Sequence, residues 1–160
     1  MNFDAVYNQN YRLVYILACK IVKDDEVSKD IAQEVFLKLH HFLANGKQVL
    51  NLEGWLKRTI YNHCLNYLRD SRKWQHSKLC ENTETEPGSD LNMIQDEERR
   101  QLRHCLGLLS EKEQVLVSLY SEGMSYKEMT EISGLCFTSV GTTLSRALAK
   151  LKKLYYHENK

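Results

Sequence analysis

The side chains that most enzymes need for covalent or metal chemistry do not form a recognisable arrangement in this sequence. No GxGxxG, P-loop or HExxH pattern is present, and Gly46-Lys47 lacks the upstream glycine of a phosphate-binding loop. The five cysteines are scattered without a CxxC pair, which favours reduced thiols over a zinc site or a disulfide framework. His40 and His41 are adjacent and face different directions on an expected helix, so they do not suit a chelate. The sequence therefore predicts a protein that is not an enzyme and uses no cofactor or metal.

The chemistry that the sequence does offer is hydrogen bonding and positive charge directed at nucleic acid. Short hydroxyl side chains and a cation recur along an expected helix that runs from about residue 138 towards the end of the chain. In a DNA major groove, small hydroxyls reach base edges while an arginine holds a phosphate. The alternative is an amphipathic helical hairpin whose hydroxyl face is merely solvated. The candidate duplex-DNA contacts are Thr138, Ser139, Thr142, Thr143, Ser145 and Arg146.

A helix-turn-helix is expected to position these hydroxyl groups. Ser125 and Glu128 have the spacing of a capping box, which predicts the start of a short helix, and Gly134 predicts its left-handed end. The second helix then needs an apolar side that packs on the first. The residues expected on that side are Phe137, Val140, Leu144, Ala147, Leu148 and Leu151.

A second surface without acids is expected on a helix from about Leu52 to Lys73. Its buried side would carry Leu56, Ile60, Cys64 and Tyr67. Amides and hydroxyls interleaved with cations and aromatic rings suit single-stranded or distorted nucleic acid, because they offer phosphate neutralisation, stacking and base-edge hydrogen bonds. The alternative is an ordinary solvated face. The candidate contacts are Trp55, Arg58, Thr59, Asn62, Asn66, Arg69 and Lys73.

The remaining elements are also expected to be helices, so the predicted fold class is all-α. Further helices are expected at residues 3–22, 28–43, 94–108 and 110–120, the last beginning with the capping box of Ser110 and Glu113. Between residues 75 and 93 the periodicity disappears and acids accumulate, which indicates a flexible acidic linker. The longest apolar stretch, 13–22, is broken by Lys20 and too short to cross a bilayer. Without a signal peptide, the protein is expected in the cytoplasm with no membrane insertion.

Three segments, taken together, resemble a small RNA polymerase sigma factor of the extracytoplasmic-function (ECF) type, which keeps only regions 2 and 4. DIAQEVFLKLH at 30–40 resembles the segment that binds the polymerase clamp helices. GWLKRTIYNHCLNYLRDSRK at 54–73 resembles the promoter-melting and minus-ten segment. LSEKEQVLVSLYSEGMSYKEMTEISG from 109, followed by TSVGTTLSRALAKL from 138, resembles the region that reads the minus-thirty-five element. The sequence departs from the family where Gly141 replaces a frequent basic residue and Asn66 a frequent aspartate.

The resemblance implies two small helical domains, a region 2 domain at 1–74 and a region 4 helix-turn-helix domain at 94–156, joined by the linker at 75–93. It implies a bacterial initiation factor whose partners are RNA polymerase core and promoter DNA, with an anti-sigma factor as a further candidate. Region 4 would read duplex DNA, while region 2 would melt DNA and hold the non-template strand, with a flipped base against the loop at 45–53. The implied polymerase contacts are Asp30, Gln33, Glu34 and Leu37. The alternative function is a helix-turn-helix regulator with an N-terminal dimerisation or signal domain.

Overall fold

The protein is all-helical throughout the described part of the chain, which confirms the predicted fold class. The computed structural model describes the backbone of residues 1–77 and 90–158, and the side chains of residues 1–72 and 94–157. Within the described residues, no helix combines the length and apolar character that crossing a bilayer requires. The helices are α1 (Phe3–Val22), α2 (Asp25–Ala44), α3 (Leu52–Ser77), α4 (Asp90–Gly107), α5 (Glu111–Ser121), α6 (Tyr126–Ser133) and α7 (Phe137–Glu158).

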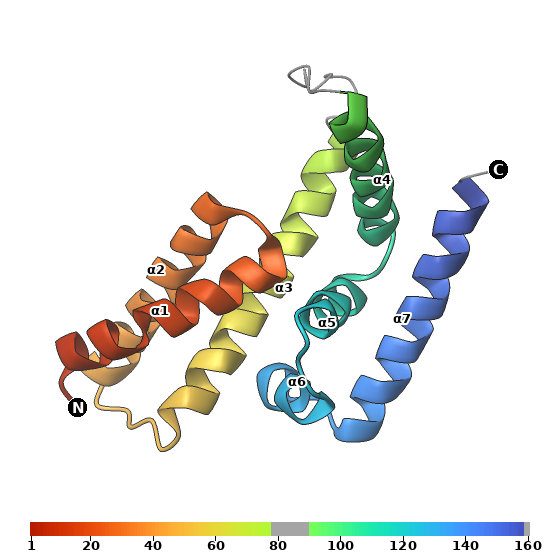
Figure 1. Cartoon of the computed structure of the whole chain (residues 1–160). Coiled ribbons are helices and arrows are strands. Elements are labelled where there is room, and N and C mark those ends of the chain that lie inside the picture. The colour runs from red at the N-terminus through yellow and green to blue at the C-terminus, as the bar shows by residue number, and fades with distance from the viewer. Residues whose placement is uncertain (78–89, 159–160) are drawn as a thin grey trace.

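Helices α1, α2 and α3 pack on one another and form an N-terminal unit (Figure 1). Its centre is apolar, with Val14, Leu39, Leu56 and Ile60 fully buried. The first helix has the predicted bounds. The second begins at Asp25, three residues before the predicted Ser28, because the Asp24 carboxylate accepts a hydrogen bond from the Val27 N–H and caps the helix there. Ser28 instead lies inside the helix and is buried.

Helices α4 to α7 form a C-terminal unit, in which α7 packs on α4, α5 and α6. Both predicted capping boxes are present: the Ser110 N–H donates to Glu113 at 2.8 Å, and the Ser125 N–H donates to Glu128 at 2.7 Å. Gly134 ends α6 with a left-handed φ of 67°, as predicted. Its backbone angle lets the chain reverse within three residues, so α6 and α7 form the expected helix-turn-helix.

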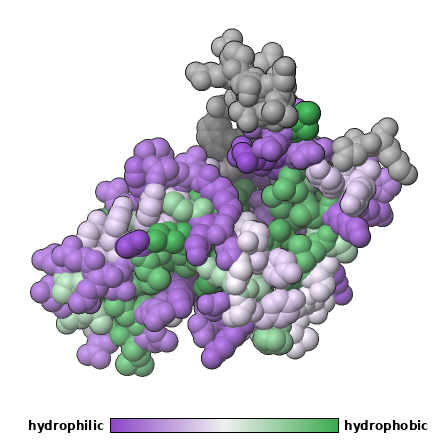
Figure 2. Space-filling model, in the orientation of Figure 1, coloured by the Kyte–Doolittle hydropathy of each residue, from purple (hydrophilic) through white to green (hydrophobic). Residues whose placement is uncertain are grey.

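The two units lie side by side along α3, an arrangement that no local sequence pattern predicts. Figure 1 shows α3 between α1 and α2 on one side and α5 and α6 on the other, and both α5 and α6 contact it. The buried side chains of the two units belong to one continuous apolar cluster. Figure 2 shows that hydrophilic side chains cover much of the face drawn, with apolar areas over the N-terminal unit and between α4 and α7. The helices α3 and α4 also extend into the predicted linker at 75–77 and 90–93; its remainder lies outside the described residues.

Candidate nucleic-acid interface

The exposed face of α7 carries the hydroxyl groups that the sequence singled out. The side chains of Thr138, Ser139, Thr142, Ser145 and Arg146 are exposed, while Thr143 is half-buried. On the opposite side, Val140, Leu144 and Ala147 are fully buried, because they pack into the core of the C-terminal unit. The predicted apolar side is wrong at one position: Phe137 is 61% exposed. Phe137 is the first residue of α7, at the edge of the C-terminal unit. Its ring packs on the ring of Tyr126, with the two ring centroids 5.6 Å apart.

The start of α7 is polarised by its own backbone. Cys136 immediately precedes the helix and its thiol lies 3.0 Å from the Ser139 hydroxyl. Hydrogen bonds from the Ser139 side chain and backbone lower the pKa of the Cys136 thiol. The backbone amides that stabilise the negatively charged thiolate would also stabilise any other anion that approaches the N-terminus of the helix. The hydroxyls of Thr138 and Ser139 therefore begin a surface that is suited to DNA phosphates and base edges.

The expected strand-binding face of α3 is only partly open. Arg58, Asn62, Asn66 and Arg69 are exposed, and their spacing of four and three residues places them on one face. Trp55 is half-buried, and the centroid of its ring lies 5.9 Å from the centroid of the Phe42 ring. The described side chains end before Lys73, so this residue lies outside the part of the face that can be placed.

Thr59 does not share the open face. It is only 5% exposed, and its hydroxyl donates to the Trp55 carbonyl at 2.8 Å. In a helix the residue four positions earlier supplies a nearby carbonyl, and a threonine that bonds there turns its hydroxyl away from solvent. Tyr67, predicted to be buried, is half-buried.

Arg58 faces the C-terminal unit. Its guanidinium lies against Gly134 at the end of α6, so closely that a methyl group added at Gly134 would overlap it. Tyr61, one turn along the same side of α3, is 3% exposed and its hydroxyl has no hydrogen-bond partner in the described part of the structure. Burial raises the pKa of the Tyr61 phenol, against a lowering by the nearby Arg58 charge. Arg58 itself is exposed, so the C-terminal unit contacts this side of α3 at Tyr61 and Arg58 without enclosing the Arg58 side chain.

The expected polymerase-binding residues form one exposed face of α2. Leu37 is 54% exposed, and Asp30, Gln33 and Glu34 are also exposed at spacings of three and four residues. A carboxylate oxygen of Glu34 lies 3.0 Å from Nδ1 of His63 on α3. The result is one aliphatic side chain framed by acids and an amide, a suitable anchor for a partner surface.

Sequence reasoning missed the residues that join the two units. Lys23 pairs with Glu122 at 2.5 Å, and Lys57 pairs with Glu131 at 3.7 Å. Each pair joins residues more than 70 positions apart, and no local pattern links them.

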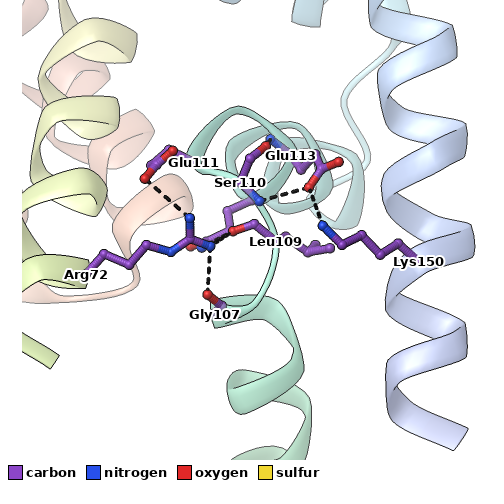
Figure 3. A network of polar contacts seen from close by, with 8 residues as sticks. Arg72, Gly107, Leu109, Ser110, Glu111, Glu113 and Lys150 are labelled. Atoms are coloured by element: carbon purple, nitrogen blue, oxygen red, sulfur yellow. Dashed lines mark hydrogen bonds and ion pairs between the residues drawn. The ribbon is translucent and has the colours of Figure 1, made fainter. Parts of the chain in front are cut away.

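A third connection centres on Arg72 near the far end of α3 (Figure 3). Its guanidinium donates to the Gly107 carbonyl at 2.9 Å and to the Leu109 carbonyl, and lies 3.5 Å from a Glu111 oxygen. These groups lie at the junction of α4 and α5, where helix-terminal carbonyls lack partners within the helix. Arg72 therefore caps a helix that lies in the other unit.

The described residues outside these surfaces form neither a reactive thiol at Cys64 nor a metal-binding cluster. Burial raises the pKa of the Cys64 thiol to about 12, so it remains protonated and unreactive. Within the described residues, no cluster of three or more histidine, cysteine or acidic side chains has a geometry that could hold a metal ion.

Comparisons with known proteins identify the class of the protein. The family model described as Sigma-70 region 2 matches residues 6–74, and the model described as Sigma-70, region 4 matches residues 99–151. The chain belongs to the RNA polymerase sigma factors of the ECF type, with regions 2 and 4. This confirms the resemblance drawn from the three sequence segments.

Individual relatives agree with this assignment. The chain is 28% identical over 159 residues to RNA polymerase sigma factor YlaC of Bacillus subtilis (strain 168), covering 95% of this chain and 91% of that protein. It is 26% identical to ECF RNA polymerase sigma factor SigE of Mycolicibacterium smegmatis, covering 94% of this chain but only 56% of that longer protein. The solved structure of the sigma factor RpoE in complex with the anti-sigma factor NepR from Bartonella quintana has the same fold, with a TM-score of 0.55 and 18% identity over 95% of both chains.

Proposed function

We propose that three separate surfaces divide the work of this sigma factor: α2 binds RNA polymerase core, α7 reads an upstream duplex element, and α3 holds the melted non-template strand. As a member of its family, the chain is an initiation factor that directs the polymerase to promoters and is not itself an enzyme. It acts where the polymerase acts, in the cytoplasm. The proposal assigns the polymerase contact and the melted strand to residues 1–74, the duplex contact to residues 94–156, and the role of a linker to residues 75–93.

The two-sided character of α7 carries the duplex assignment. Hydroxyls and Arg146 are exposed on one side, while Val140, Leu144 and Ala147 are fully buried on the other. A helix held so firmly by its apolar side presents its polar side in a fixed orientation, which groove recognition requires. Thr143 is half-buried and is assigned a supporting contact at the edge of this surface.

The open amides of α3 support the assignment of the melted strand. Asn62 and Asn66 offer donors and acceptors to unpaired base edges, and Arg69 offers a charge to the backbone. Each captured base gains on the order of 1 to 3 kcal/mol from stacking and hydrogen bonds, which offsets a similar cost of unstacking. Promoter opening is then driven by binding energy without nucleotide hydrolysis. The loop at 45–53 is the proposed site of a flipped base.

The test is transcription by purified core polymerase on genomic fragments, with start sites mapped. We expect start sites that appear only when the protein is added. Triple replacement of Asn62, Asn66 and Arg69 by alanine should abolish them on duplex templates, while initiation on templates with a pre-melted bubble should recover in part. A matched control replaces Asn8 and Gln9, two exposed amides on α1, by alanine and should initiate normally. No start sites beyond those of core alone would contradict the proposal and favour a regulator that acts without polymerase.

An anti-sigma factor is a second proposed partner. The support is that RpoE, a chain of the same fold, was solved in complex with the anti-sigma factor NepR. Such a partner would have to bind surfaces that polymerase or DNA also needs, because only then would it inhibit.

A further inference from the structure

Phe137 is an exposed aromatic side chain at the start of the helix that we assign to duplex DNA. It is the first residue of α7, and 61% of it is exposed. The next two residues, Thr138 and Ser139, are exposed as well. Unlike Val140, which is fully buried, Phe137 takes no part in the apolar core. The ring is therefore continuous with the hydroxyl groups of the proposed DNA-reading surface.

The Phe137 ring is nevertheless held in place. Tyr126, the first residue of α6, lies beside it, with the ring centroids 5.6 Å apart and the ring planes tilted by 57°. Tyr126 is half-buried, and its ring also lies near Gly141, because a methyl group added at Gly141 would be 3.5 Å from it. Tyr126 thus supports the Phe137 ring from one side. A side chain that is already supported loses little freedom when a partner covers the rest of it.

Two rows of residues run side by side at the start of α7. Phe137 and Gly141 are four residues apart and form an apolar row, while Thr138 and Thr142 form a row of hydroxyls at the same spacing. Glycine has no side chain, so a base edge is able to approach the helix closely beside the ring. In the major groove, thymine presents the matching pair of groups, a C5-methyl group and the O4 acceptor.

We propose that Phe137 is a specificity-determining residue of this factor and contacts the C5-methyl group of a thymine in the upstream duplex element. This inference deepens the proposed role of α7 and rests on it. The first residues of a recognition helix are the ones that contact base edges, and Phe137 is the first residue of α7. A ring against a methyl group buries apolar surface that cytosine does not offer, so the contact discriminates between the two pyrimidines.

Removal of the methyl group without any other change in the base tests this contact. Start-site mapping supplies the promoter fragments, and each thymine in either strand of the upstream element is replaced in turn by deoxyuridine. The affinity of the factor bound to core polymerase is then measured by titration of labelled duplexes. At one position or more, deoxyuridine should lower the affinity about three- to fivefold, the change that corresponds to one buried methyl group. An upstream element without thymine, or an affinity that is unchanged at every position, would overturn the proposal.

Phe137→Ala assigns the methyl effect to the ring. In this variant, thymine and deoxyuridine at the sensitive position should bind within about 1.5-fold of each other, because the effects of removing two groups that touch are not additive. Phe137→Leu keeps an apolar side chain and should keep part of the discrimination. Phe137 is exposed, so thermal unfolding of both variants should resemble that of the wild type. A full methyl effect in Phe137→Ala would contradict the contact.

Tyr156→Ala is the matched control. Tyr156 is also 61% exposed and lies on the same helix, 19 residues or about 28 Å from Phe137. This variant should keep the wild-type response to deoxyuridine at every position. The same response lost in Tyr156→Ala and in Phe137→Ala would overturn the assignment, because the effect would then follow any loss of exposed aromatic surface on α7.

Cytosine and 5-methylcytosine give a second comparison at the sensitive position, since these two bases differ only in the C5-methyl group. The wild type should bind the methylated base about three- to fivefold more tightly, and Phe137→Ala should bind both equally. A preference of equal size in both proteins would show that the methyl group acts through the shape of the DNA. That result would also overturn the contact with Phe137.

The outcomes separate this inference from the proposed function. Start sites that depend on the added protein, without any effect of the methyl group, would refute the role of Phe137 and leave the proposed function intact. A complete absence of such start sites would refute the proposed function, and the inference with it. A loss of affinity in Phe137→Ala that is the same on every duplex, with the methyl effect unchanged, would place the ring on the DNA backbone and refute only the contact with thymine.

Discussion

Truncation of Leu37 tests the polymerase-facing surface most directly. This side chain is 54% exposed and lies among acidic and amide groups on the outer side of α2. Full burial of a leucine side chain is worth roughly 1.5 to 3 kcal/mol. About half of the side chain remains to be buried by a partner, so Leu37→Ala should cost about 0.8 to 1.6 kcal/mol of core binding, or roughly four- to fifteenfold in affinity.

Leu37→Asp should weaken binding further, because docking would then have to desolvate a carboxylate as well. The assay titrates fluorescently labelled protein with purified core polymerase and follows anisotropy. Thermal unfolding of each variant is measured alongside. An exposed position far from the core of the fold should change stability by no more than about 0.5 kcal/mol, so a loss of binding reports on the surface itself.

Ile94→Ala is the matched control. Ile94 is also an exposed aliphatic residue on a helix, 65% exposed, but it lies on α4 and outside the proposed polymerase-binding face. Its truncation should leave core affinity unchanged. If Leu37→Asp binds core as tightly as the wild type, the assignment of this face of α2 is wrong; equal losses in both variants would point to a non-specific effect of apolar surface.

Three further predictions concern α6 and α7. Arg146→Ala should weaken binding to duplex DNA of any sequence, and the slope of log affinity against log salt should fall by about one, as measured by titration at several salt concentrations. Gly141→Ala should raise the free energy of unfolding by roughly 0.5 to 1 kcal/mol in a thermal melt, because alanine favours a helix interior and its methyl group would lie at an ordinary 3.5 Å from Tyr126. The Ser125 N–H holds the pKa of Glu128 below its ordinary 4.5, so the stabilisation is complete above that pH and is lost as the pH falls through the lowered value. Glu128→Gln should therefore destabilise at pH 7, and the difference from the wild type in urea unfolding should shrink as the pH is lowered step by step below the ordinary 4.5.

The local features of the fold were predictable because they depend on neighbouring residues. The capping boxes at Ser110 and Ser125 and the left-handed glycine at position 134 each satisfy backbone groups within one turn of helix. The start of α2 was predicted too late because Asp24 and Ser28 both have side chains that cap helices, and the sequence does not say which one is used. Here the earlier residue is the cap: the Asp24 carboxylate accepts from the Val27 N–H, while the Ser28 hydroxyl donates to the Asp24 carbonyl from inside the helix.

The partners of α3 were not predictable in the same way. Helical periodicity tells which residues share a face, and it placed Asn62, Asn66 and Arg69 together on an exposed surface, as the structure has them. It does not tell which second element covers the neighbouring face. Arg58 was grouped with the open residues by its helical spacing and is exposed, yet its guanidinium also lies against Gly134, which is 76 positions away along the chain. Contacts at that separation depend on how the two units pack, which no single segment encodes.

The spacing of the two arginine contacts on α3 sets how the halves of the molecule are able to move. Arg58 and Arg72 belong to one unbroken helix, and fourteen residues of helix span about 21 Å. Two anchors at that distance fix an orientation as well as a position. A rotation of the C-terminal unit about either contact would have to break the other one, so the two contacts together hold that unit in a single orientation on α3.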